Sequence, residues 1–140
     1  MLTPEARAAL EERVRAIPIT STLEMEFLDL DEGRCHVRVP RQKKYDGVFE
    51  SFHGGLLMTV ADSVACYAIL TLTGPDQVLT TTDMNIRLLA PCLTAVRADA
   101  RVIKLGRTMC PVQVDLFDDA DKHVAVAQVN YMRLERMPSR

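Results

Sequence analysis

Tryptophan is absent from this 140-residue sequence, and Phe and Tyr together supply only 5% of its residues. An excess of basic residues is also missing, because 17 Lys and Arg stand against 19 Asp and Glu, for a formal net charge of −2. Domains that bind nucleic acid usually combine clustered basic residues with aromatic stacking surfaces. We therefore expect no nucleic-acid partner.

The four cysteines form no Cys-x-x-Cys pair and are accompanied by no histidines at metal-ligand spacing; they are Cys35, Cys66, Cys92 and Cys110. We therefore predict no metal site and no redox cofactor. Cys66 and Cys110 lie in apolar segments, where a free thiol behaves as a small hydrophobic residue. The N-terminus has no basic segment followed by an apolar core, so we expect no signal peptide. A reduced, cytoplasmic chain is the simplest interpretation.

One apolar run dominates what the sequence does contain. From Leu56 to Leu72 almost every residue is apolar on every face of a helix, which predicts a buried helix over 54–73. The run is too short for a membrane span and carries Asp62 in its middle, so we expect no membrane partner. A carboxylate among apolar residues is costly unless something uses or satisfies it. Two glycines, Gly54 and Gly55, stand at the helix start, where backbone N–H groups can bind an anion. These features together predict an active site.

The rest of the chain predicts a single α+β domain over residues 1–140. Thr3-Pro4-Glu5 is typical of a helix start, and Pro18 is expected to end this N-terminal helix, residues 1–18. A strand hairpin follows, and after a loop over 41–52 and the long helix, four more strands form the main sheet over 77–134. The expected strands are 23–30, 35–39, 78–89, 96–102, 109–117 and 123–134, before a polar tail over 135–140.

Short connections between the C-terminal strands predict that they are antiparallel neighbours. One sheet of six strands cannot cover the long helix on every side. Two such sheets joined edge to edge in a dimer would help to bury both helices, which makes a second copy of the chain the expected partner.

Three motifs resemble a known family. The first is the H-G-G-x-x-x-x-x-A-D pattern from His53 to Asp62, the second is T-D-M-N-I over 82–86 followed by L-A-P over 89–91, and the third is K-L-G-R-T over 104–108. In this order the chain resembles the hotdog-fold acyl-CoA thioesterases, in the branch typified by the phenylacetate-pathway thioesterase. The resemblance spans roughly residues 20–134 of this sequence.

The resemblance implies a hotdog fold, in which a curved antiparallel sheet of six strands wraps one long helix. It also implies a homodimer or homotetramer with active sites at the interface, where Asp62 of one protomer faces the Gly54 N–H of the other. The substrate would be an acyl-CoA, with coenzyme A as part of the substrate and no separate cofactor. Gly55, Lys104 and Arg107 are the expected substrate-binding residues, the last two for the phosphates of coenzyme A.

Thioester hydrolysis needs an activated water or a nucleophile, and a donor for the oxygen that becomes negative. Asp62 is the expected general base or nucleophile, and the two routes stay open. The Gly54 N–H is the expected oxyanion donor. Thr81 is a candidate for holding the attacking water, although threonine also simply favours strands. His53 is expected to position the loop or to hydrogen-bond near the thioester, rather than to act as the base.

One position departs from the family pattern. Many members carry an asparagine six residues before the histidine, and this chain has Gly47 there. A non-catalytic acyl-CoA-binding module therefore stays open as an alternative. A hotdog hydratase or dehydratase is a second alternative, although the short motif that pairs a histidine with an acid in those enzymes is not found. A purely structural dimer is the third.

Overall fold

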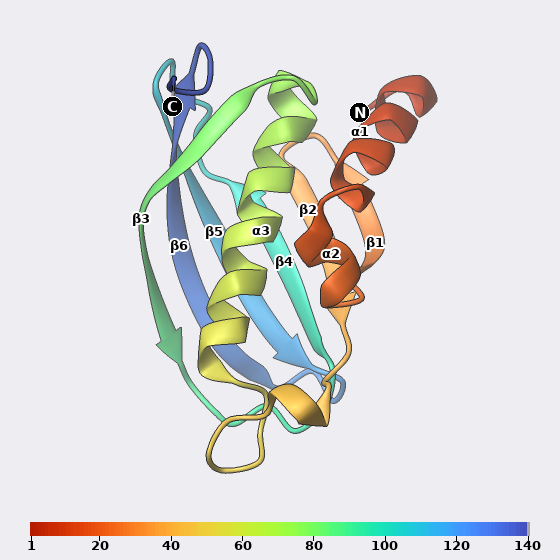
Figure 1. The fold of residues 1–140 in the computed structure, drawn as a ribbon, viewed down its shortest axis with the longest axis vertical. Coiled ribbons are helices and arrows are strands. Elements are labelled where there is room, and N and C mark those ends of the chain that lie inside the picture. The colour runs from red at the N-terminus through yellow and green to blue at the C-terminus, as the bar shows by residue number, and fades with distance from the viewer. Residues whose placement is uncertain (140) are drawn as a thin grey trace.

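A computed structural model describes residues 1–139 of the chain as one α+β domain (Figure 1). The elements in chain order are α1 Pro4–Arg15, α2 Pro18–Thr22, β1 Glu26–Asp31, β2 Arg34–Val39, a 3-10 turn Lys43–Tyr45, α3 Gly54–Thr73, β3 Val78–Leu88, β4 Val96–Val102, β5 Met109–Asp118 and β6 His123–Leu134. The long helix and the six strands agree with the prediction to within a few residues. Of the predicted polar tail, Arg140 lies outside the described residues.

The six strands form one antiparallel sheet that curves around α3 (Figure 1). Alternate side chains of each inner strand are buried against the helix, because successive strand residues point to opposite faces. Small side chains allow a close approach: Ala98 and Ala100 on β4 face a helix that carries Ala61, Ala65 and Ala68, all of them buried. The sheet and α3 together form the core of the domain.

The strand order is β1-β2-β4-β5-β6-β3. β4, β5 and β6 are joined as predicted, but β3 pairs with β6 and forms the far edge of the sheet. The chain then crosses from one side of α3 to the other between Leu88 and Val96. A sheet that curls around a helix needs strands on both flanks, and this crossing supplies the second flank.

The N-terminal segment differs from the prediction in part. The predicted N-terminal helix is confirmed as α1, which ends at Arg15, before Pro18. Pro18 then occupies the first position of a second short helix, α2, where the fixed φ of proline suits a helix start. β1 therefore begins at Glu26 rather than at residue 23. A bulge between Phe27 and Asp29 changes which side of β1 faces the core, which explains the irregular apolar pattern of this segment.

The long helix α3 is not buried on every side within one chain. Half of its 20 residues are buried, but Met58 and Leu72 are each 38% exposed, and Asp62 and Cys66 are half-buried. Although α3 has the length and hydropathy of a membrane span, its buried half lies in the core of the domain. Figure 1 shows α1 and α2 on the β1–β2 side of the helix and β3 on the opposite side.

A bulge in β3 orients the side chains near Asp62. Thr81 pairs with Tyr131 of β6, whereas Asp83, two residues later, pairs with Asn130, so Thr82 is the extra residue. In a regular strand, residues two apart point to the same face. The bulge instead lets Thr81 reach Asp62 of the helix, while Asp83 bonds the side chain of Asn130 on the outer face.

Candidate active site

His53 caps the N-terminus of α3. Its Nδ1 accepts a hydrogen bond from the Gly55 N–H at 2.9 Å, and its carbonyl oxygen accepts from the N–H groups of Leu56 and Leu57. A Cβ on Gly55 would lie 3.1 Å from the imidazole ring, so glycine permits this close contact. The imidazole therefore has a structural role, and the Gly55 N–H, predicted to bind substrate, is already used within the chain.

The Gly54 N–H has no hydrogen-bond partner among residues 1–139, unlike the three N–H groups that follow it. Unpaired N–H groups at a helix N-terminus carry partial positive charge and favour an anionic partner. A Cβ on Gly54 would lie 3.0 Å from Cδ1 of Leu88, at the end of β3. The predicted oxyanion donor is thus free to bind.

Two hollows flank this end of the helix. One of about 460 Å³ contains Gly54 in its wall, and the other, of about 320 Å³, contains Gly55. Both volumes fall in the range of small-molecule sites. Apolar residues form most of the first wall, which comprises Phe49, Ser51, Phe52, Gly54, Leu57, Leu88, Leu89, Ala90, Pro91 and Cys92. A substrate with an apolar portion suits this end of the molecule.

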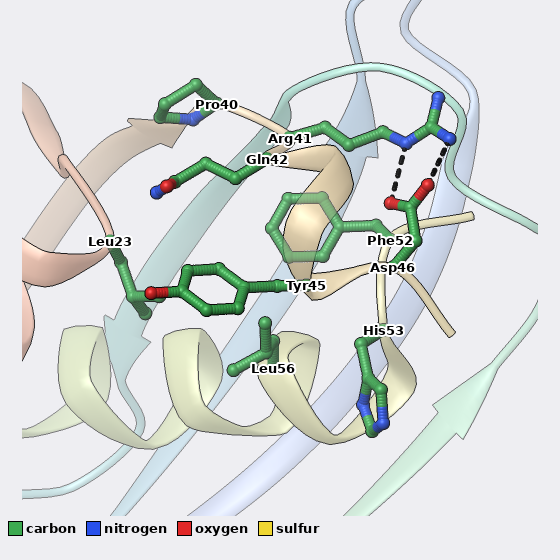
Figure 2. Close-up of a pocket in the computed structure, with 9 residues that line it drawn as sticks. All are labelled: Leu23, Pro40, Arg41, Gln42, Tyr45, Asp46, Phe52, His53 and Leu56. Atoms are coloured by element: carbon green, nitrogen blue, oxygen red, sulfur yellow. Dashed lines mark hydrogen bonds and ion pairs between the residues drawn. The ribbon is translucent and has the colours of Figure 1, made fainter. Parts of the chain in front are cut away.

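Arg41 holds the loop that leads into α3. Its guanidinium donates to both carboxylate oxygens of Asp46, at 2.9 and 2.5 Å, and Figure 2 shows the two side chains facing each other above Phe52. The same group donates to the carbonyl oxygens of Glu50 and Leu93, so it joins this loop to the β3–β4 crossing. The hydrogen bond from Arg41 lowers the pKa of Asp46 and keeps it ionised.

Gly47 brings no side chain to the place where many members of the resembled family have an asparagine. Its N–H donates to the carbonyl oxygen of Ser51 at 3.0 Å, and its carbonyl oxygen accepts from Glu50. The neighbouring acid, Asp46, is occupied by Arg41. Gly47 itself therefore supplies no replacement for the asparagine amide, and the amide of Gln42 in the same loop donates to the carbonyl oxygen of Thr22.

Asp62 lies on the flank of α3 that faces β3 and β6. Its Oδ1 accepts hydrogen bonds from the hydroxyl groups of Thr81, at 2.7 Å, and Tyr131, at 2.8 Å. Its other carboxylate oxygen, Oδ2, has no partner in the described part of the chain. One oxygen is thus held while the other is available to a water molecule or a substrate, as expected for a base or nucleophile.

Tyr131 is the residue of this cluster that sequence analysis missed. It lies in β6 and looks like an ordinary core tyrosine, because strands commonly carry buried aromatics. Only the pairing of β6 with β3, and of Thr81 with Tyr131, brings its hydroxyl to the helix. No local pattern in the sequence signals that register.

One chain does not bring all the predicted site residues together. Asp62 stands eight residues after Gly54, which is about 12 Å along a helix axis. A single thioester group cannot contact both. Arg107 lines a hollow with Thr73 and Gln77 at the opposite end of α3, and Lys104 is exposed in the same hairpin. The residues predicted for coenzyme A thus lie far from the Gly54 of their own chain.

Comparison with known proteins identifies relatives of this chain. The family model described as the thioesterase superfamily matches residues 49–125, more than half of the sequence. A protein of Saccharolobus solfataricus named as an esterase is 29% identical over 109 residues, which cover 76% of each chain. A second protein named as an esterase, from Halobacterium salinarum, is 27% identical over 123 residues, covering 84% of this chain and 81% of its own. These relatives support a hydrolase of the esterase or thioesterase kind.

Solved structures share the fold over nearly the whole chain. The Escherichia coli PaaI protein from the phenylacetic acid degradation operon has a TM-score of 0.87 at 19% identity, covering 99% of this chain and 100% of its own. A thioesterase family protein from Silicibacter pomeroyi has a TM-score of 0.84 at 22% identity, covering 92% and 98%. The predicted hotdog fold is therefore confirmed.

The role of Arg41 in the loop can be tested with Arg41→Lys. Lysine cannot pair with both oxygens of Asp46 and also reach two carbonyl groups, so the loop should open more often. Phe49, 90% exposed at its tip, is a suitable chymotrypsin site. We expect cleavage after Phe49, followed by mass spectrometry, to be several times faster than in the wild type. The matched control is Arg38→Lys, which weakens the exposed pair with Asp119; equal cleavage in both variants would contradict this role.

Proposed function

The chain belongs to the thioesterase superfamily, and we propose that it hydrolyses the thioester of an acyl- or aryl-acyl-CoA to a free acid and coenzyme A. The observation that carries this proposal is the state of Asp62, whose Oδ1 is held by two hydroxyl donors while Oδ2 has no partner among residues 1–139. The unpaired Gly54 N–H supports it, since it suits the oxygen that becomes negative.

The chemistry can follow either of two routes. In the first, Oδ2 of Asp62 takes a proton from a water molecule, which attacks the thioester carbonyl carbon. In the second, Oδ2 attacks that carbon itself, and water then hydrolyses the mixed anhydride. In both routes the carbonyl oxygen gains negative charge beside the Gly54 N–H, and the C–S bond breaks to release the thiolate of coenzyme A, which then takes up a proton. The Thr81 hydroxyl donates a hydrogen bond to Asp62, so its oxygen can still accept a hydrogen bond from the water.

We further propose that two protomers share each active site, in a homodimer or a homotetramer. The separation of about 12 Å between Asp62 and Gly54 of one helix supports this, because a second helix running alongside could supply the missing group. Exposed apolar side chains around the same end of α3 also support it: Val48 is 89% exposed, Phe49 90%, Leu88 53% and Leu89 52%. In such a dimer, Lys104 and Arg107 would serve the phosphates of coenzyme A bound at the other protomer's Gly54.

The four cysteines are all free thiols, and three of them are buried. Burial raises the pKa of Cys66 to about 11, so this thiol stays protonated and unreactive at neutral pH. We propose a reducing compartment, the cytoplasm, as the working location. The reaction as proposed needs no metal and no separate cofactor.

A non-catalytic acyl-CoA-binding module remains the second candidate. Gly47 favours it, because glycine has no side-chain amide for the thioester carbonyl and its own N–H is already bonded to Ser51. The one side-chain amide of this loop, that of Gln42, donates to the carbonyl oxygen of Thr22 instead. The two candidates differ in turnover, and the experiments below separate them.

The first test is a thiol-release assay over a panel of aromatic and aliphatic acyl-CoAs, run beside Asp62→Asn. Asparagine can still accept from Thr81 and Tyr131 but cannot act as a base or nucleophile. We therefore expect kcat to fall by about 10²- to 10⁴-fold while the fold is kept. The matched control is Asp83→Asn. Asp83 lies on the outer face of β3, where it bonds Asn130 rather than the helix, so this variant should keep its activity. A wild type that binds acyl-CoA without turnover would favour the binding module.

The second test replaces Gly54 by proline. Proline has no N–H but suits the first position of a helix, and His53 already has an extended conformation, with φ −57° and ψ 127°. We expect kcat to fall by about 10²- to 10³-fold, as when other oxyanion donors are lost. The control is Gly54→Ala, which adds the same Cβ near Leu88 but keeps the N–H. Equal losses of kcat in the two variants would show that contact with Leu88, rather than the N–H, is responsible.

The third test mixes Asp62→Asn protomers with Gly54→Pro protomers by unfolding and refolding them together. If sites are shared, each hybrid dimer has one site with both native groups, so the mixture should recover about a quarter of wild-type activity. If both groups act within one protomer, no site in the mixture is intact, and activity should stay at the level of the separate variants. Light scattering confirms that the mixture is dimeric or tetrameric.

A further inference from the structure

Tyr131 is a buried residue whose hydroxyl contacts Asp62. Its Oη lies 2.8 Å from Oδ1 of Asp62 and 2.8 Å from the main-chain oxygen of the same residue. A phenol carries one proton, so the hydroxyl donates to one of these two acceptors at a time. Since both acceptors belong to Asp62, the contact holds this residue in either case.

The tyrosine is itself firmly placed. Its side chain is only 5% exposed, and its strand neighbours are Cys110 on β5, which is fully buried, and Thr81 on β3. Burial raises the pKa of Tyr131 far above its ordinary value, so the hydroxyl stays protonated and remains a donor. Thr81, by contrast, is exposed, and water can compete for its place beside Asp62. Of the two donors to Oδ1, Tyr131 is the one that the core holds in place.

We propose that Tyr131 is a positioning residue for the reaction at Asp62. By holding Oδ1, its hydroxyl prevents the carboxylate from rotating about its Cβ–Cγ bond and keeps Oδ2 directed toward the reacting group. A carboxylate with one donor exchanges its two oxygens more easily, and a base held loosely loses much of the advantage of its placement. This inference rests on the proposed hydrolase function, and it assigns to Tyr131 no proton transfer and no contact with the substrate.

The test is Tyr131→Phe, which removes the hydroxyl and keeps the ring. We expect kcat to fall by about tenfold or more while KM stays close to that of the wild type, because the change affects the orientation of the base and not substrate binding. The matched control is Tyr67→Phe. Tyr67 is 2% exposed and its hydroxyl bonds Thr20 at 2.9 Å, so this variant also loses a buried hydroxyl of the same core, away from Asp62.

A second measurement separates positioning from a general loss of structure. In the Asp62→Asn background, Tyr131→Phe should cause no further loss of kcat, because its effect acts through the carboxylate. Thermal unfolding is measured for every variant, and similar melting temperatures for Tyr131→Phe and Tyr67→Phe would exclude unfolding as the cause. Loss of activity in Tyr131→Phe alone supports the proposal.

Three outcomes overturn it: a kcat for Tyr131→Phe close to that of the wild type, an equal loss in Tyr67→Phe, or a change in KM alone. Each of these leaves the hydrolase function intact, because the wild type is then active. A wild type that releases no thiol from any acyl-CoA overturns the proposed function, and the role of Tyr131 in it, at once. The two failures are therefore distinguished by the wild-type assay.

Discussion

The burial of one apolar helix against a curved sheet is the constraint on which the rest of this structure depends. The sheet curls because α3 must lose water contact on several sides, and small residues on β4 and on the helix let the two approach closely. The same curvature needs a strand on each flank of the helix, which places β3 at the far edge beside β6. The chemistry of the site follows from that placement, because β3 and β6 carry Thr81 and Tyr131 to Asp62.

The helix also separates the two polar functions that the proposed reaction needs. Its N-terminus supplies an unpaired N–H at Gly54, where the helix dipole favours negative charge. Its middle supplies a carboxylate that would be costly among apolar residues without the two hydroxyl donors on Oδ1. Since these groups are held about 12 Å apart by a rigid helix, a site shared between two copies of the chain is the simplest way to join them.

The start of α3, with His53 as its cap and Gly54 and Gly55 as its first residues, shows how neighbouring residues take different roles. From the sequence, both Gly54 and Gly55 were expected to offer backbone N–H groups to the substrate, and His53 to position the loop or to hydrogen-bond near the thioester. In the structure, the His53 imidazole accepts from the Gly55 N–H, whereas the Gly54 N–H has no partner among the described residues. The loop before them is held by Arg41 and Asp46, two residues that no motif marks as a pair. Thr81 reaches Asp62 only because a bulge at Thr82 changes the face of the strand.

The sequence by itself determined the long helix and the strands, because apolar runs and alternation are local signals that act over a few residues. It also pointed to Asp62 and Gly54, since a charged residue and paired glycines are conspicuous in an apolar segment. Only the tertiary structure decided the place of β3 and the contact of Tyr131 with Asp62. These depend on strand register and on packing between distant segments, which no local pattern encodes.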